Sequence, residues 1–209
     1  MKVISTNLGK STTIHWNSKE EKTGIFKYPV AEPIFLGLTK VEKDTITDRK
    51  HHGGSFKACY LFSSTYYPFW QERYPSLDWD WGMFGENITV KGMDEAQLII
   101  GSVYQLGNAL VQITIPREPC YKLGIRFKDQ KIIKEFIEHG HPGTYVRVLN
   151  EGTVQKGDSF LLQDQANHNV NISDFYRMLY AKEKDQDLLK IVQGLEAIPK
   201  RTRDKLSRY

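Results

Sequence analysis

The sequence predicts a mainly β protein, built as a barrel or a sandwich, with a small helical extension at its C-terminal end. Residues 1–162 contain short β-rich runs broken by glycine and turn residues, and few segments with helical periodicity. Many short strands at close spacing favour a barrel or sandwich over a parallel α/β sheet. After Asn169 the β-branched runs give way to apolar residues at helical spacing. We therefore expect a β domain over residues 1–163 and helices over residues 164–209.

The expected strands are runs of β-branched and aromatic residues bounded by turn residues. They cover residues 2–6, 12–16, 34–36, 57–62, 87–90, 103–106, 110–116, 145–148 and 159–162. Two helices are expected between them, at residues 63–74 and 129–139; the second stops at Gly140. In the extension, Ser173 is the expected N-cap of the first helix, and Pro199 precedes a short basic last helix. These two or three small helices should pack together or onto the β domain.

Charge and cysteine content limit the classes of function. The chain has 209 residues and a net charge of +4, but residues 1–197 carry 24 basic and 24 acidic groups, so the excess belongs to the last helix. A nucleic-acid-binding module is therefore disfavoured, because the body is neutral and no base-stacking motif is evident. No apolar run approaches the ~18 residues of a membrane span, and the N-terminus lacks the apolar core of a signal peptide. We expect a cytoplasmic protein in which Cys59 and Cys120 are free thiols.

A basic segment at residues 48–57, DRKHHGGSFK, places three cations and two imidazoles around Gly53 and Gly54. The glycines can adopt positive φ and bring backbone N–H groups close to an anion, and the basic side chains supply charge. The segment is either an anion cradle or a solvated basic turn. It lacks the spacing of a P-loop.

A second segment at residues 81–90, WGMFGENITV, has two glycines three positions apart before a predicted strand. Glu86 and Asn87 then stand at a junction between loop and strand, where their side chains can orient a ligand. The alternative is an ordinary turn that enters a strand.

A third segment at residues 116–123, PREPCYKL, follows an apolar strand. Its two prolines restrict the backbone after that strand, so Arg117 and Cys120 should be held in fixed positions at the strand's end. Arg117 and Lys122 should stabilise a thiolate at Cys120, which suits nucleophilic attack or binding of a soft metal. The alternative is a buried, inert cysteine, which is how we interpret Cys59 in its apolar strand. A zinc site is disfavoured, because the six histidines lack the usual spacing of zinc ligands.

Taken in order, these segments resemble the MOSC domain, the family named after the C-terminal part of molybdenum cofactor sulfurases, and within it the small YiiM-like bacterial branch. The matching motifs are DRKHHGG at residues 48–54 with Lys57, GMFGENIT at 82–89, PREPCYKL at 116–123, GTYVRVL at 143–149 and GTVQKGD at 152–158. The resemblance implies a MOSC-type β-barrel with a few inserted helices. The helical extension resembles that of the YiiM-like branch through residues 194–199, GLEAIP.

The resemblance also implies a cofactor and an activity. Cys120 matches the cysteine that binds molybdenum in the molybdenum cofactor, whose pterin and phosphate would contact Lys50, His52, Gly53, Gly54, Lys57, Asn87 and Arg117. Related enzymes reduce N-hydroxylated compounds, such as hydroxylaminopurines and amidoximes, to amines by oxygen-atom transfer. Two cysteines cannot hold an Fe–S cluster, so the electrons should come from a separate donor protein. The alternative function is a cofactor carrier, or a protein that handles sulfur on Cys120, without substrate turnover.

Overall fold

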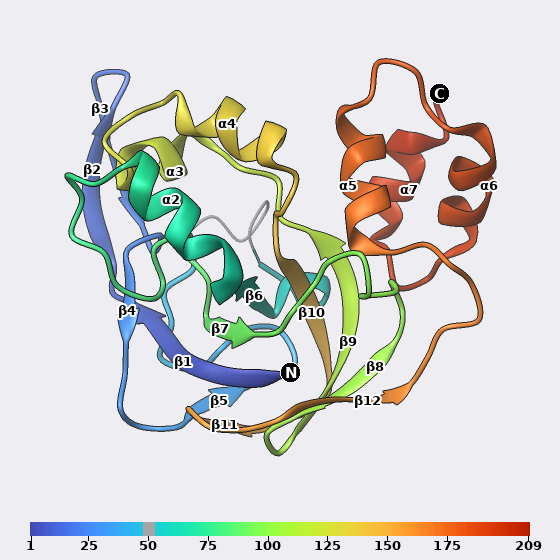
Figure 1. Cartoon of the computed structure of the whole chain (residues 1–209), viewed down its shortest axis with the longest axis horizontal. Helices are drawn as coiled ribbons and strands as arrows, with labels where there is room; N and C mark the ends of the chain where they lie inside the picture. Colours follow the sequence, from blue (N-terminus) through green and yellow to red (C-terminus); the bar gives the residue numbers. More distant parts are fainter. Residues whose placement is uncertain (48–52) are drawn as a thin grey trace.

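An eight-stranded mixed sheet forms the framework of the computed structural model, which describes residues 1–47 and 53–209 (Figure 1). Its strands are β1 (Lys2–Gly9), β4 (Lys27–Pro29), β6 (Cys59–Ser63), β7 (Ile88–Lys91), β8 (Val103–Leu106), β9 (Ala109–Pro116), β10 (Thr144–Asn150) and β12 (Phe160–Asp164). The order across the sheet is β12-β8-β9-β10-β6-β7-β1-β4. Neighbouring strands are antiparallel except β6 and β7, which run parallel. The mainly β prediction is thus confirmed.

The closed barrel expected from the resemblance is not confirmed. The ladders give an open order of strands, with β12 and β4 at its two ends. The start of β1 nevertheless meets the start of β12 through an isolated antiparallel bridge between Lys2 and Ser159. Hydrogen bonds from the backbone N–H of Val3 to the carbonyl of Asp158 (2.9 Å) and from Phe160 to Met1 (3.0 Å) support this bridge. The sheet therefore curls until β1, which lies beside the edge strand β4, touches the edge strand β12 without a continuous ladder between the two.

Two small antiparallel pairs stand beside the main sheet. One is a hairpin of β2 (Thr12–Trp16) and β3 (Lys19–Thr23), and the other joins β5 (Ile34–Leu36) to β11 (Gly152–Val154). The hairpin carries Trp16 onto Tyr121, with the two rings stacked at 5.1 Å. Because Tyr121 follows Cys120 in the chain, the hairpin packs beside the segment that carries the predicted cysteine.

Among the strands, the described residues form three short helices: α2 (Tyr67–Arg73), α3 (Tyr121–Arg126) and α4 (Ile132–His139). The helices expected at residues 63–74 and 129–139 are confirmed, although a 3-10 turn, Ser64–Tyr66, begins the first one. Gly140 ends α4 in the left-handed conformation, with φ of 79°. The sequence did not predict α3.

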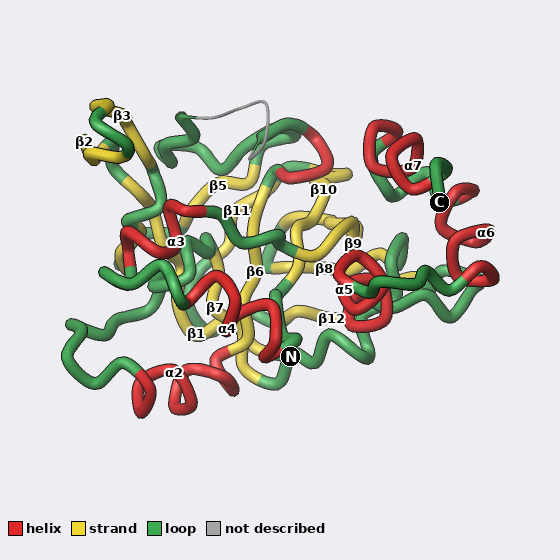
Figure 2. Tube along the Cα trace, turned by 90° about the horizontal axis from the view of Figure 1, so that it is seen from above, coloured by secondary structure: helices red, strands yellow, loops and turns green. Residues whose placement is uncertain are grey.

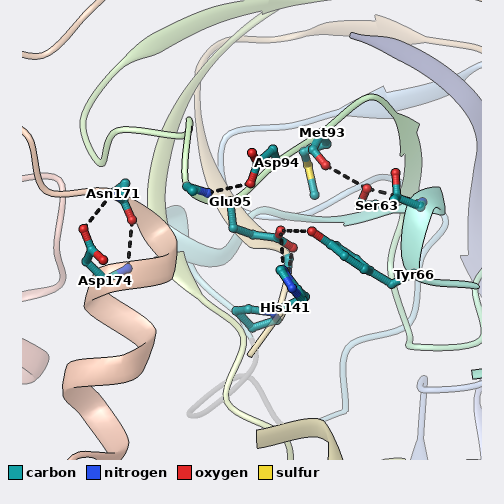
Figure 3. Close-up of polar contacts among 12 residues, drawn as sticks. Ser63, Tyr66, Met93, Asp94, Glu95, His141, Asn171 and Asp174 are labelled. Atoms are coloured by element: carbon teal, nitrogen blue, oxygen red, sulfur yellow. Dashed lines mark hydrogen bonds and ion pairs between the residues drawn. The ribbon is translucent and has the colours of Figure 1, made fainter. Parts of the chain in front are cut away.

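The extension contains α5 (Ile172–Tyr180), α6 (Gln186–Gly194) and α7 (Lys200–Leu206), set together at one side of the sheet (Figure 2). The expected N-cap is wrong, because Asn171, not Ser173, caps α5 by accepting a hydrogen bond from the backbone N–H of Asp174 at 2.8 Å (Figure 3). Helix α5 packs against β9. The division at residues 163 and 164 stays a prediction. In the described ranges, no helix has the length and apolarity required to cross a membrane.

Candidate functional site

A pocket at the end of β9 brings together four of the residues predicted from the sequence: Lys57, Asn87, Arg117 and Cys120. These residues come from three separate segments, and the sheet order places β9, β10, β6 and β7 side by side. The enclosed space is about 80 Å³, within a wider opening of about 610 Å³ that includes open solvent. Only one end of a large ligand would therefore be enclosed.

Cys120 stands at the N-terminus of α3, in an extended conformation with φ of −132° and ψ of 169°. Its side chain lines the pocket and is partly exposed, so the alternative of a buried, inert cysteine is wrong for this residue. Cys59 is 1% exposed, and burial raises the pKa of its thiol well above the ordinary value. The structure thus separates a packing cysteine from an accessible one, as the sequence predicted.

Arg117 is buried in the pocket wall with only 3% of its surface exposed. Its guanidinium lies over the rings of Tyr60, at 5.5 Å from the ring centre, and Phe136, at 5.7 Å. The Nη1 atom is buried and has no hydrogen-bond partner among the described residues. A buried donor without a partner costs about 1–3 kcal/mol, so an acceptor atom of a ligand in the pocket would lower the energy of this site.

A buried ion pair between Lys27 and Asp44 lines the same pocket. One oxygen of Asp44 also accepts a hydrogen bond from the side-chain amide of Asn87 at 2.9 Å, and the other accepts one from the backbone N–H of Gly9 at 2.8 Å. The Asn87 side-chain oxygen in turn accepts from the backbone N–H of Tyr60 at 3.3 Å. Asn87 therefore holds Asp44 in place and ties it to β6.

The pocket is electropositive. Lys27, Lys57, Arg117 and Lys122 line it, against the single carboxylate of Asp44. The amino group of Lys57 lies 5.3 Å from the ring centre of Tyr145, which also lines the pocket. Burial raises the pKa of Tyr145 to about 12, although Arg117 acts in the opposite direction, so this phenol stays neutral near pH 7. The arrangement suits an anionic ligand.

Glu86 does not face the pocket, so its expected role in orienting a ligand is wrong. Its carboxylate is fully buried and accepts hydrogen bonds from the backbone N–H groups of Gly82 (2.9 Å) and Phe84 (3.1 Å), and from the hydroxyl groups of Tyr67 and Thr89. Burial raises the pKa of Glu86, and the hydrogen bond from Tyr67 opposes that rise. Glu86 thus fixes the turn that leads to Asn87.

The basic segment is described only in part, since Lys50 and His52 lie outside the described residues. Gly54 has a positive φ of 94°, as expected, and caps the 3-10 turn Ser55–Lys57. Gly53 and Gly54 are not among the lining residues, whereas Lys57 is. The anion cradle at residues 48–57 therefore stays a prediction.

Sequence reasoning missed Lys27, Asp44, Tyr60 and Tyr145 as members of the site. Lys27, Asp44 and Tyr60 belong to none of the quoted motifs, and only the fold brings Lys27 and Asp44 together. Tyr145 lies within the GTYVRVL motif but has the pattern of an ordinary strand residue. In the described part of the chain, no group of three or more His, Cys, Asp or Glu side chains could hold a metal ion.

Comparisons with known proteins show which family the chain is related to. A sequence model described as the MOSC domain matches residues 48–160. The chain is similar to the protein YflK of Bacillus subtilis (strain 168), with 35% identity over 88% of this chain and 82% of the relative. It is similar to a protein named reductase from Gibberella moniliformis, with 32% identity over 81% of this chain but only 31% of that protein. The crystal structure of YiiM from Geobacillus stearothermophilus matches with a TM-score of 0.83 and 28% identity, covering 99% of this chain and 97% of that one.

Proposed function

Because this chain belongs to the MOSC domain family, we propose that it binds the molybdenum cofactor at the Cys120 pocket and reduces N-hydroxylated compounds to amines there. One observation carries the proposal: the pocket joins an accessible cysteine to a buried arginine whose Nη1 atom has no partner among the described residues. The name of the fungal relative, reductase, agrees with this class of reaction.

The side chains in the pocket fit this cofactor by their chemistry. The cofactor carries a phosphate and a metal bonded to sulfur, and a soft thiolate is a suitable ligand for such a metal. Cys120 would supply the thiolate. Arg117 and Lys57 would bind anionic oxygen atoms, and Asn87 would act through Asp44, which it holds. Lys50, His52, Gly53 and Gly54 remain proposed contacts of the phosphate.

The reaction R–NHOH + 2 e⁻ + 2 H⁺ → R–NH₂ + H₂O requires electrons, protons and a site for oxygen removal. The bound cofactor would supply the redox chemistry at the metal. The protein would supply protons from the pocket, where the Tyr145 phenol is protonated at neutral pH. Arg117 stays charged at every relevant pH and would stabilise negative charge on the ligand.

The electrons would come from a separate donor protein, because the two cysteines of this chain cannot hold an Fe–S cluster. The match to the relative named reductase covers 31% of that protein, so most of that relative lies outside the region shared with this chain. A donor protein therefore remains part of the proposal, together with the small N-hydroxylated substrate.

The test is to replace Cys120 with serine and express both proteins in a host that makes the cofactor. We expect the Cys120→Ser variant to fold normally, to lose most of its molybdenum, and to lose turnover of 6-hydroxylaminopurine by at least about 100-fold, the scale of losing a central catalytic interaction. Cys59→Ser is the matched control, and it should keep both molybdenum and turnover. Molybdenum analysis, an activity assay with a chemical reductant and a melting curve give the three readouts.

Two results would overturn the catalytic assignment. Undiminished turnover in Cys120→Ser would show that the thiol is dispensable. Stoichiometric molybdenum in the wild type, without turnover over a range of N-hydroxylated substrates, would identify a cofactor carrier instead.

A further inference from the structure

The hairpin of β2 and β3 forms a stiff projection beside the Cys120 pocket (Figure 1). Its two strands pair over their whole length without a shift of register. The turn between them has two residues, Asn17 and Ser18, whose positive φ values of 49° and 59° are those that a type I′ turn requires. Strand β3 ends at Thr23, which lines the pocket together with Cys120. The hairpin therefore leads from a surface turn directly to the pocket wall.

An aromatic pair joins this hairpin to the segment that carries Cys120. Trp16, the last residue of β2, stacks on Tyr121 with the ring centres 5.1 Å apart and an angle of 20° between the ring planes. The Trp16 side chain is half-buried, so part of it reaches the surface. Tyr121 directly follows Cys120 in the chain. The pair therefore makes a continuous aromatic contact from the surface to the residue next to the proposed metal ligand.

Three further contacts hold Tyr121 in this position. Its hydroxyl group donates a hydrogen bond to the Oε2 atom of Glu21 on β3 at 2.5 Å. Its backbone carbonyl accepts one from the side-chain amide of Gln130 at 3.1 Å. The amino group of Lys122, which lines the pocket, lies 5.8 Å from the centre of the Tyr121 ring. Because the hairpin, the pocket wall and the turn after α3 all hold this residue, the stack is in place before any partner arrives.

Exposed lysines without a countercharge stand beside the aromatic pair. Lys19 is the register partner of Trp16 in the hairpin. Lys128 and Lys131 lie on either side of Gln130, in the turn between α3 and α4. All three lysines are exposed, and none makes an ion pair with another described residue. Several exposed lysines elsewhere pair with a carboxylate three or four residues away. The three lysines therefore leave their charge available to a partner.

The sequence around these lysines is basic as well. Residues 121–134 contain five basic groups and one acidic group, Asp129. The Asp129 carboxylate accepts a hydrogen bond from the backbone N–H of Lys131 at 2.9 Å. Residues 12–23 of the hairpin contain two basic and two acidic groups, and one of the acids, Glu21, is already bound to Tyr121. A surface with this balance attracts an acidic protein and speeds its approach.

The position of the aromatic pair suits an electron donor. Electron transfer slows steeply with distance, so a donor protein must bind where a short path leads to Cys120. The contact between Trp16 and Tyr121 provides such a path. The basic helix α7 is the other surface that could attract an acidic donor, but it lies at the opposite end of the molecule from the hairpin (Figure 1). The two surfaces can therefore be tested against each other.

We propose that the hairpin of β2 and β3, together with the turn at residues 128–131, binds a small acidic protein of the ferredoxin type, which delivers electrons through Trp16 and Tyr121. This inference rests on the proposed function. The overall reaction is 2 Fd(red) + R–NHOH + 2 H⁺ → 2 Fd(ox) + R–NH₂ + H₂O, where Fd is the ferredoxin. Each ferredoxin loses one electron, the N–O bond breaks, and the oxygen leaves as water. Electron-transfer complexes commonly bury less than about 1,200 Å², so a surface of this small size is sufficient.

The binding test uses the full-length protein and a plant-type ferredoxin, an acidic one-electron donor, in an NMR titration at low salt. The hairpin-side variant combines Lys19→Glu, Lys128→Glu and Lys131→Glu. We expect it to bind ferredoxin at least about 10-fold more weakly, because contacts between opposite charges become contacts between like charges. The difference should shrink at about 0.5 M salt, where exposed charges are strongly screened.

The matched control makes the same change of charge at the other end of the molecule. It combines Arg201→Glu, Lys205→Glu and Arg208→Glu, which are exposed residues in and after α7. This variant should bind ferredoxin as the wild type does. Equal weakening in the two variants would show that only net charge matters, and weakening in the control alone would place the donor on the extension. Either result, or unchanged binding in both variants, would overturn the inference.

The loaded enzyme tests the aromatic path with two electron donors. Reduced methyl viologen is a small molecule that does not need a docking surface, so the readout is the ratio of ferredoxin-driven to viologen-driven turnover of 6-hydroxylaminopurine. General damage to the pocket would lower both rates and leave this ratio unchanged. We expect the ratio to fall several-fold in Trp16→Leu, which removes the stacked ring, and to recover in Trp16→Phe, which restores a ring. An unchanged ratio in Trp16→Leu would overturn the electron path.

Failure of this inference and failure of the proposed function give different results. If the wild type binds ferredoxin through the three lysines but turns over no N-hydroxylated compound, the proposed function is wrong and the docking surface stands. If the wild type reduces these compounds, and the hairpin-side variant uses ferredoxin as well as the wild type does, the docking surface is wrong and the proposed function stands.

Discussion

The buried Lys27–Asp44 pair is the residue-scale feature on which the geometry of the pocket depends. The exposed fractions of the two side chains are 8% and 2%, and Asp44 also binds Asn87 and the backbone of Gly9. Removal of one partner from such a pair leaves the other charge buried and uncompensated, which costs far more than the loss of a surface pair. The pair therefore links the position of Asn87 to the stability of the fold.

We predict that Asp44→Asn lowers the free energy of unfolding by about 3 kcal/mol, because Lys27 then remains buried without a countercharge. The matched control is Asp204→Asn, which breaks the exposed pair between Lys200 and Asp204, whose side chains are 81% and 55% exposed. That change should cost less than about 1 kcal/mol. Urea denaturation measures both values. Similar losses in the two variants would contradict the importance of the buried pair.

At this scale, the sequence predicted the residues that belong to a local motif and missed those that only the fold brings together. Cys120 and Arg117 were identified because prolines and basic residues surround them in one short segment. Asp44 has no such signal: its partners Lys27 and Asn87 are 17 and 43 positions away in the chain. Glu86 was identified, but its role was misread. Its carboxylate is buried because the backbone N–H groups of Gly82 and Phe84 donate hydrogen bonds to it, and the sequence does not show this contact.

At the scale of elements, strands with an apolar pattern were predicted well, and strands without one were missed. The runs at residues 12–16, 34–36 and 103–106 agree with the structure at both ends. Strand β3, KEEKT, has no apolar alternation, because it is the exposed half of a hairpin. Strand β11 has three residues, and its place is set by pairing with β5, which is more than 100 positions earlier. Neither β3 nor β11 therefore shows the local alternation of apolar residues by which a strand is predicted.

The N-cap of α5 allows a test of which of two nearby residues, Asn171 or Ser173, stabilises the start of the helix. Asn171 accepts the backbone N–H of Asp174, so Asn171→Ala should lower the free energy of unfolding by about 1 kcal/mol. Ser173, which the sequence favoured, lies inside the helix and makes no cap, so Ser173→Ala should change stability by less than about 0.5 kcal/mol. Thermal or urea unfolding of both variants decides between them. A larger loss for Ser173→Ala would contradict the assigned cap.

At the scale of the whole molecule, the sheet and the helical extension share one hydrophobic core. Buried residues of α5 and α6, such as Phe175 and Val192, belong to the same cluster as the strand residues Phe62 and Val146. The change in sequence texture after Asn169 indicated a different kind of secondary structure, but periodicity alone cannot show whether two parts share a core. Contacts between distant segments decide that, and here they join the extension to β9.

A shared core predicts that the chain unfolds in one cooperative transition. All four tryptophans lie before residue 82, so their fluorescence reports on the β region, whereas far-UV circular dichroism also reports on α5, α6 and α7. The two unfolding curves should coincide.

Phe175→Ala, in the extension, should destabilise the protein by about 3–5 kcal/mol and shift both curves together, because the cavity lies in the common core. The exposed α6 residue Ile191, 45% exposed, is the matched control, and Ile191→Ala should leave both midpoints nearly unchanged. If Phe175→Ala shifted the dichroism curve but not the fluorescence curve, the extension would be a separate folding unit.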